Sequence, residues 1–222
     1  MIKYKLTDEN LRTYGGCQWG EGVTHTASGE GELCGPGWIH VYDSPELAVL
    51  LNPMHANFKN PVLWKVRVSG LAKHDRGLIS GYTKVTSLRR MELTTVSREQ
   101  RVKFAILCAP LVYKDKQFKS WATAWISGKE RSARSAAAAV APRAAAADAS
   151  GYDARAAAAD AAAYAARAAA SYAARAAAAD AAAATYAAAA ISAAAYAARA
   201  DSASENKNLN LKRLAKMALS GR

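Results

Sequence analysis

The chain has few of the residues from which catalytic and metal centres are usually built. Its 222 residues include only three cysteines and four histidines. Cys17, Cys34 and Cys108 lack the paired spacing of a zinc site, and no histidine has a second ligand at metal-ligand spacing. We therefore expect no metal site and no cofactor. We also expect a cytoplasmic protein whose thiols are reduced and mostly buried.

Long hydrophobic runs are also lacking. The first residues lead directly into polar sequence without the apolar stretch of a signal peptide. The alanine-rich segment of the second half is interrupted by charges every few positions, and alanine contributes little to membrane insertion. The sequence therefore predicts no membrane partner.

Acidic residues are scarce relative to basic ones, because 18 Asp and Glu face 30 Lys and Arg, for a net charge of +12. Residues 1–130 carry +6 of this charge, and residues 131–200 and 201–222 carry +3 each. A charge spread along the chain favours solubility and loose attraction to anions. It is weaker evidence for nucleic acid than a basic stripe would be, so nucleic acid is not the favoured partner.

Composition divides the chain sharply near residue 130. All Trp, Phe, His and Cys lie before this point, whereas 44 of the 70 residues in 131–200 are alanine. Alanine has the highest helix propensity, so this segment predicts helix. We divide the chain into a strand-rich domain (1–96), a two-helix connector (97–130), an alanine-rich helical repeat region (131–200) and a capping amphipathic helix (201–222).

Residues 1–96 show strand signals separated by turns. Alternation and β-branched or aromatic residues indicate five strands, at 2–6, 38–42, 62–68, 83–88 and 91–96. Ser44 and Pro45 begin a short predicted helix that ends near Leu51, because Asn52 and Pro53 follow. The glycine-rich stretch 29–37 lacks the lysine and the strand–loop–helix context of a phosphate-binding loop, and we interpret it as turns.

From Ser97 the period changes to that of a helix. Ser97 and Gln100 form a capping box, and the helix is expected to end at Pro110. A second helix is predicted from about Asp115 to Ser127, and a small amphipathic helix lies near the end of the chain, over 209–219. Strands followed by helices indicate an α+β fold: a small mixed N-terminal domain followed by an all-helical alanine-rich array.

The alanine-rich region contains a degenerate Tyr-x-x-Arg-x-x-x-x-Asp repeat. Within one helix the Arg and the Asp lie about 140° apart, so the Arg can pair better with an Asp of a neighbouring helix. A single helix of about 50 residues, about 75 Å long, and several packed helices both fit the pattern. The residues predicted to mediate assembly are Tyr152, Arg155, Asp160, Tyr164, Arg167, Tyr172, Arg175 and Asp180.

One stretch of the chain is densely basic and could hold phosphate or nucleotide, although a solvated surface explains the same charges. The candidate ligand-binding residues are Lys84, Arg89, Arg90, Arg98 and Arg101.

Several motifs resemble an uncharacterised domain of bacteriophage and prophage proteins. The run Leu33-Cys34-Gly35-x-Gly37-Trp38-Ile39-His40 is similar to the "LC-x-x-GFHA" pattern of that family, and a strand ending Val66-x-Val68-x-Gly70 follows in both. The resemblance implies a phage-encoded protein in the host cytoplasm. It implies no activity, so no functional residue is transferred from the family.

A second resemblance concerns fold alone. The segment Gly37 to Ala48 is similar to the strand-to-helix segment of ADP-ribosyltransferases, in which a strand holds NAD and a later glutamate acts in catalysis. This resemblance implies Tyr42 and Glu92 as candidate catalytic residues. The first His or Arg of that family has no counterpart here.

These observations favour a non-enzymatic, phage-type binding and assembly protein. The helical array would drive homo-oligomerisation, and the N-terminal domain would bind a host or viral protein partner. The alternatives are a nucleotide- or NAD-binding domain of the ADP-ribosyltransferase type and a nucleic-acid-binding protein. An ice-binding alanine helix would need a regular threonine face, and Thr185 is the only threonine of the array.

Overall fold

The computed structural model describes residues 1–75, 77–112, 116–132, 134–135, 138 and 210–220. Within these residues the chain combines an antiparallel sheet with helices, which confirms an α+β fold. It divides into two compact units, Met1–Thr95 (the N-terminal unit) and Val96–Arg222 (the C-terminal unit). The predicted assembly residues, Tyr152 to Asp180, lie outside the described residues, as does nearly all of the predicted array.

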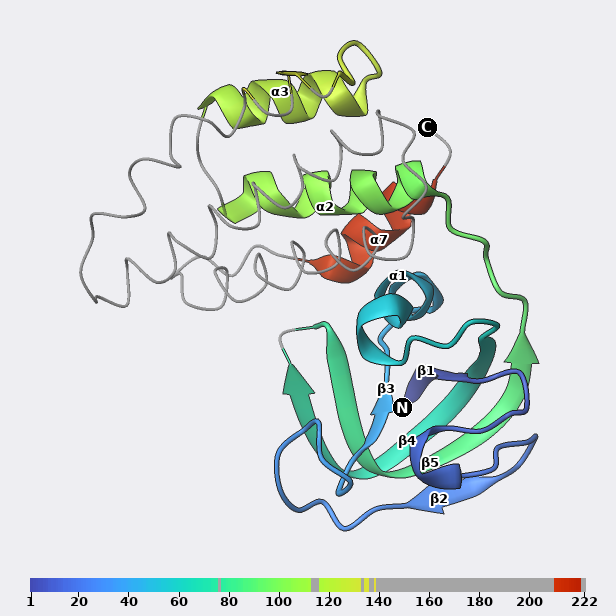
Figure 1. Ribbon diagram of the computed structural model, residues 1–222. Helices are drawn as coiled ribbons and strands as arrows, with labels where there is room; N and C mark the ends of the chain where they lie inside the picture. The colour runs from blue at the N-terminus through green and yellow to red at the C-terminus, as the bar shows by residue number, and fades with distance from the viewer. Residues whose placement is uncertain (76, 113–115, 133, 136–137, 139–209, 221–222) are drawn as a thin grey trace, which may run out of the picture. The chain divides into compact units, whose positions relative to one another are not determined.

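The N-terminal unit is built on one antiparallel sheet (Figure 1). The strands are joined in the order β1-β4-β5-β2, and β3 pairs with β5. A further bridge between Tyr4 and Tyr42 connects β1 to the residue after β3, so the sheet curls around its core. The strands are β1 (Ile2–Thr7), β2 (Thr24–Thr26), β3 (Ile39–Val41), β4 (Val62–Asp75) and β5 (Ile79–Met91), and η1 (Tyr14–Gly16) is a short 3-10 turn.

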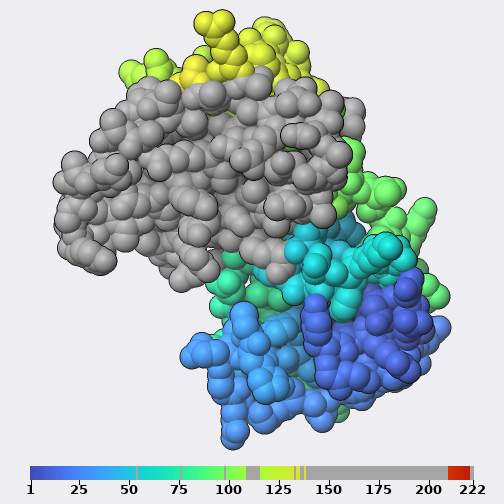
Figure 2. Space-filling model, in the orientation of Figure 1, coloured from blue at the N-terminus to red at the C-terminus, as the bar shows by residue number. Residues whose placement is uncertain are grey.

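The inside of the curled sheet is filled by large apolar side chains. Trp64, Val66 and Val68 of β4 are each at most 2% exposed, as their alternation along the strand requires. Trp19 and Tyr82 complete the same cluster. The space-filling view shows the N-terminal residues, in dark blue, adjoining later segments of this unit, in lighter blue and cyan (Figure 2).

Two of the predicted strands are a single element. The residues predicted as strands 83–88 and 91–96 form one 13-residue strand, β5, which ends at Met91, so the second predicted strand is wrong. β5 pairs along β4 in a long hairpin and bends at two register shifts, one between Lys65 and Val66 and one between Ser69 and Ala72. β2 was not predicted, because a three-residue edge strand, Thr-His-Thr, leaves no apolar alternation.

Helix α1 (Pro45–His55) begins as predicted and ends later. The Ser44 Oγ accepts a hydrogen bond from the Leu47 N–H over 3.2 Å, which is the expected N-cap. The helix was expected to end near Leu51 but continues through Pro53. Its end is fixed instead by Asn52, whose backbone carbonyl accepts from Ala56 and whose side-chain amide pairs with both backbone groups of Phe58.

The C-terminal unit contains three described helices, α2 (Arg98–Val112), α3 (Lys116–Ile126) and α7 (Leu211–Leu219). The predicted capping box is present: Gln100 N–H donates to Ser97 Oγ, and Ser97 N–H donates to Gln100 Oε1. Helix α2 continues two residues beyond Pro110, where the sequence predicted its end. Helix α3 agrees with its prediction and is followed by Gly128 in the left-handed conformation, with φ of 76°.

Helix α7 packs against α2, more than 90 residues earlier in the chain. Its buried face consists of Leu211, Leu214, Ala215 and Ala218, at helical spacing. Gln100 Nε2 donates to the Leu219 carbonyl over 3.2 Å, so polar contacts also connect the two helices. Among the described residues, no helix has both the length and the apolar character needed to cross a membrane.

Candidate functional site

The inner side of β1 carries lysines in the core of the N-terminal unit. Lys3 is 9% exposed and pairs with Asp43, whereas Lys5 is 6% exposed. The Lys5 ammonium donates to the His40 carbonyl over 3.1 Å and lies 4.8 Å from the centroid of the Trp19 ring. Burial lowers the pKa of Lys5 to about 8, because the charged form loses water. The contacts of both lysines thus lie within the fold.

Tyr42, a candidate from the ADP-ribosyltransferase resemblance, is enclosed by the fold. It is 3% exposed, and its ring stacks on His55 of α1 with centroids 5.8 Å apart. Burial raises the pKa of the Tyr42 phenol and lowers the pKa of His55 to about 4. The His55 Nδ1 is buried and has no hydrogen-bond partner among the described residues. Both groups are therefore neutral at pH 7.

Glu92, the second candidate of that resemblance, makes no contact with Tyr42 among the described residues. Glu92 is exposed and comes directly after Met91, the last residue of β5. Val41, beside Tyr42, pairs instead with Ser80 near the beginning of β5. The structure does not bring the two candidates together.

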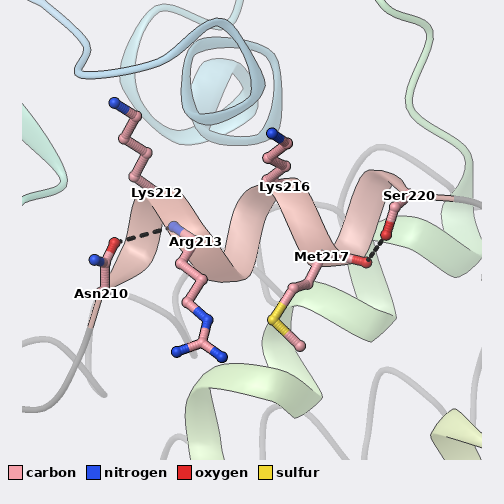
Figure 3. Close-up of a pocket in the computed structure, with 6 residues that line it drawn as sticks. All are labelled: Asn210, Lys212, Arg213, Lys216, Met217 and Ser220. Atoms are coloured by element: carbon pink, nitrogen blue, oxygen red, sulfur yellow. Dashed lines mark hydrogen bonds between the residues drawn. The ribbon is translucent and has the colours of Figure 1, made fainter.

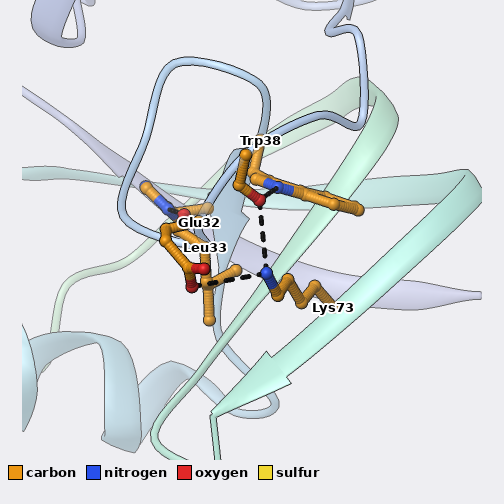
Figure 4. Close-up of polar contacts among 6 residues, drawn as sticks. Glu32, Leu33, Trp38 and Lys73 are labelled. Atoms are coloured by element: carbon orange, nitrogen blue, oxygen red, sulfur yellow. Dashed lines mark hydrogen bonds and ion pairs between the residues drawn. The ribbon is translucent and has the colours of Figure 1, made fainter.

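The glycine-rich stretch is held as a loop against the β4–β5 hairpin (Figure 4). The Lys73 ammonium donates to the Gly31 carbonyl over 3.2 Å and lies 3.5 Å from the Glu32 carboxylate. The Trp38 indole N–H donates to the same Gly31 carbonyl over 3.1 Å. At Gly37 a Cβ would lie 2.1 Å from the Glu30 carbonyl oxygen, so only glycine fits this close approach. These contacts agree with the interpretation of the stretch as turns.

The outer side of the sheet carries basic residues of β4 and β5, which we name the cationic sheet face: Lys65, Arg67, Lys84 and Arg89. Lys65 pairs with Arg89, Arg67 with Thr86, and Ser69 with Lys84. Directly paired residues point to the same side of a sheet, and the core residues Trp64, Val66 and Val68 occupy the alternate positions. All four basic residues therefore lie on the side opposite the core.

The cationic sheet face is accessible, and no described residue forms an ion pair with it. Arg67, Lys84 and Arg89 are exposed and Lys65 is half-buried. Within the part of the chain that the structure describes, the four side chains make no hydrogen bond or ion pair. Lys3 and Lys5, by contrast, are buried and their ammonium groups have partners within the fold.

The basic candidates from the sequence are divided by the fold. Lys84 and Arg89 belong to the cationic sheet face, whereas the register places Arg90 opposite Trp64, on the other side of the sheet. Arg98 and Arg101 belong to α2, in the C-terminal unit. Sequence reasoning missed Lys65 and Arg67. Their outward alternation in strand 62–68 was the available signal, but their pairing with β5 was not visible in the sequence.

A second basic surface lies on α7, opposite its buried face (Figure 3). Lys212 and Lys216 point to one side of the helix, and Arg213 and Met217 point to the other. These residues, with Asn210 and Ser220, line a shallow hollow of ≈ 570 Å³. The hollow adjoins a short helix and contains no convergent set of chemical groups.

The thiols differ from their prediction. Cys108 is buried in α2, and burial raises its pKa, but Cys17 and Cys34 are exposed. The prediction of mostly buried thiols was wrong, because two of the three lie in turns at the surface. Among the residues with described positions, no three His, Cys, Asp or Glu side chains gather in a group that could hold a metal.

Comparisons of the chain with protein-family models, with curated proteins and with solved structures give no match.

Proposed function

We propose that the chain is a non-enzymatic binding and assembly protein of the phage type suggested by its sequence motifs. The N-terminal unit binds a partner through an exposed surface. The alanine-rich segment forms an all-helical array through which copies of the chain associate.

The observation that carries this proposal is the packing of both α3 and α7 on α2. Helix α3 precedes the alanine-rich segment and α7 follows it, so the described residues on either side of that segment share one helical base. The Lys103 ammonium also donates to the Ser220 carbonyl over 3.4 Å, beside the Gln100 contact with Leu219. An element that begins and ends on one base suits an array of several helices better than one extended rod.

The base itself is well packed. Phe118, Trp121 and Trp125 of α3 are at most 6% exposed, and the Phe118 and Trp121 rings lie 5.4 Å apart. Arg131 closes this end of the base: its guanidinium lies 4.8 Å from the centroid of the Trp125 ring and forms a 2.8 Å ion pair with Glu99. A stable base of this kind can present an alanine-rich array for association.

Light scattering of the full chain tests the proposal, with Tyr164→Ala/Tyr172→Ala as the assembly variant. Alanine is the strongest helix former, so the substitutions should leave the circular dichroism signal for helix unchanged while removing two aromatic rings. We expect a defined oligomer for the native chain and a lower mass for the variant. Tyr14→Ala, an exposed tyrosine of the N-terminal unit, is the control and should not change the mass. A monomeric native chain would overturn the assembly role.

Among the described residues, nothing favours the ADP-ribosyltransferase alternative: Tyr42 is enclosed, and no contact joins it to Glu92. The nucleic-acid alternative has one observation in its favour, the cationic sheet face.

A further inference from the structure

We infer that the cationic sheet face of the N-terminal unit binds the phosphate backbone of a single-stranded nucleic acid. The inference rests on the binding role proposed above and names the chemistry of the partner. Four features of the face carry it: spacing, lack of internal counter-charge, extent and neighbouring side chains.

The spacing makes the four cations a continuous track. Lys65 and Arg67 are two residues apart on β4, which separates them by about 6.6 Å along the strand. Lys65 lies directly opposite Arg89, at a typical cross-strand separation of about 5 Å. Lys84 lies opposite Ser69, one further step along the same side of β4. Each cation is thus adjacent to another.

Among the residues that the structure describes, none forms an ion pair with the track. Like charges directly opposite each other on a sheet destabilise it, and Lys65 with Arg89 is such a pair. The residues that share these rows are uncharged: Ile2 and Tyr4 of β1, Thr24 and Thr26 of β2, and Ser69 and Thr86 of the hairpin. An anion that binds the face supplies the missing charge.

The extent of the track indicates a polymer. The cations occupy three successive rows across β4 and β5, so they do not converge on one point as the ligands of a small anion would. A chain of phosphates can contact all of them in sequence, with release of counterions at each contact. The Thr24 and Thr86 hydroxyls are hydrogen-bonded to each other over 2.7 Å, which leaves one O–H free to donate to a phosphate.

The neighbouring aromatic ring indicates that the bound nucleic acid is single-stranded. Tyr4 lies on the same side of the sheet, in the same row as Lys65, and is half-buried. An open sheet surface with a ring beside cations is the arrangement on which unstacked bases bind. In a duplex the bases are stacked on each other and have no free face for Tyr4.

The fold explains why the sequence did not favour nucleic acid. Lys65 and Arg67 lie almost 20 residues before Lys84 and Arg89, so the charges are dispersed along the sequence. Hairpin pairing brings them to one face, while Lys3 and Lys5 are turned inward.

Fluorescence anisotropy of the full chain tests the inference. The probes are labelled 12-residue oligothymidylate and oligouridylate, titrated between 50 and 200 mM salt. Four phosphate contacts predict a slope of log K against log salt of about −3, from about 0.7 per contact on a single strand. A preference between the two probes identifies DNA or RNA as the source of the backbone.

The decisive variant is Arg67→Gln/Lys84→Gln, with Lys59→Gln/Arg90→Gln as the matched control. Both variants remove two exposed positive charges from the N-terminal unit, but only the first removes them from the cationic sheet face. The first should weaken binding by about tenfold or more and should bring the slope to about −1.5. The control should keep the native slope.

A third variant, Lys212→Gln/Lys216→Gln, removes the same charge from α7. Four results would each overturn the inference. The first two are equal losses of affinity in all three variants and a loss confined to the α7 variant. The other two are tighter binding of a 12-base-pair duplex and no binding of any probe. Light scattering on the same samples separates the two proposals. If the chain is an oligomer that binds neither probe, the assembly role stands and the binding inference fails. If it is a monomer that binds through Arg67 and Lys84, the binding inference stands and the assembly role fails.

Discussion

The two sides of one sheet place basic residues in opposite situations. On the inner side, Lys3 and Lys5 are nearly inaccessible, and an Asp, a carbonyl and an indole ring contact their ammonium groups. On the outer side, Lys65, Arg67, Lys84 and Arg89 have no such contacts among the described residues. The comparison teaches that burial and partners, and not residue type, separate charges that serve the fold from charges available to a ligand.

The largest predicted effect removes the partner of an inner lysine. Asp43→Ala leaves the Lys3 ammonium without its counter-charge, and breaking a fully buried pair costs about 3–5 kcal/mol. The Asp43 side chain is 36% exposed, so we expect a smaller loss, about 2 kcal/mol, in urea unfolding. Glu21→Ala, at an exposed carboxylate, is the control and should cost less than about 0.5 kcal/mol. Equal losses in the two variants would show that the Lys3 contact contributes nothing.

The second prediction concerns His55 of α1, whose ring stacks on Tyr42. His55 has a pKa of about 4 in the folded chain, because burial lowers it from 6.5. The unfolded chain therefore binds more protons between these values, and stability falls as the pH decreases through this window. For a single such group the loss between pH 7 and pH 5 is about 2 kcal/mol. Unfolding of His55→Phe should depend less on pH, and an unchanged slope would contradict the assignment to His55.

A smaller effect is expected at Lys5. Its pKa of about 8 lies below the ordinary 10.5, so the folded chain loses the Lys5 proton at a lower pH than the unfolded chain does. Stability of the native chain should therefore rise as the pH increases from 8 to 10.5. Lys5→Met removes this dependence and should stabilise the chain by about 1 kcal/mol at pH 7, because the desolvation of the ammonium exceeds its contacts. Thermal unfolding at pH 7, 9 and 10.5 measures the difference, and a destabilised Lys5→Met at pH 7 would show that the contacts dominate.

Local signals in the sequence predicted local structure well. Ser44, and Ser97 with Gln100, mark helix starts because their side chains bond to backbone groups three residues away. The apolar positions of strand 62–68 predicted its buried side, because alternate residues of a strand point to the same side of the sheet. Helix ends were less predictable: Pro53 lies inside the last turn of α1 and does not end the helix.

Features that depend on distant partners could not be predicted. In β1 the alternation Ile2, Tyr4, Leu6 suggests an apolar inner side, but the inner side carries Lys3 and Lys5. Their contacts in the core come from Asp43 and Trp19, which are distant in the sequence and are brought close by the fold. The cationic sheet face likewise depends on the β4–β5 register, including the extra residue Leu88 that places Arg89 opposite Lys65.

The central claim is that the cations of the outer side bind an anion from outside the protein. The most direct test is thermal unfolding of the native chain and of Arg67→Gln/Lys84→Gln, each with and without excess oligothymidylate. Without the oligonucleotide the variant should be equally stable or more stable, by about 0.5 kcal/mol, since adjacent like charges are removed. With the oligonucleotide at about 100 times the Kd of the native chain, the native chain should gain about 2.7 kcal/mol, and a variant that binds tenfold more weakly should gain about 1.4 kcal/mol. A variant that is less stable alone, or that gains as much as the native chain, would contradict the account.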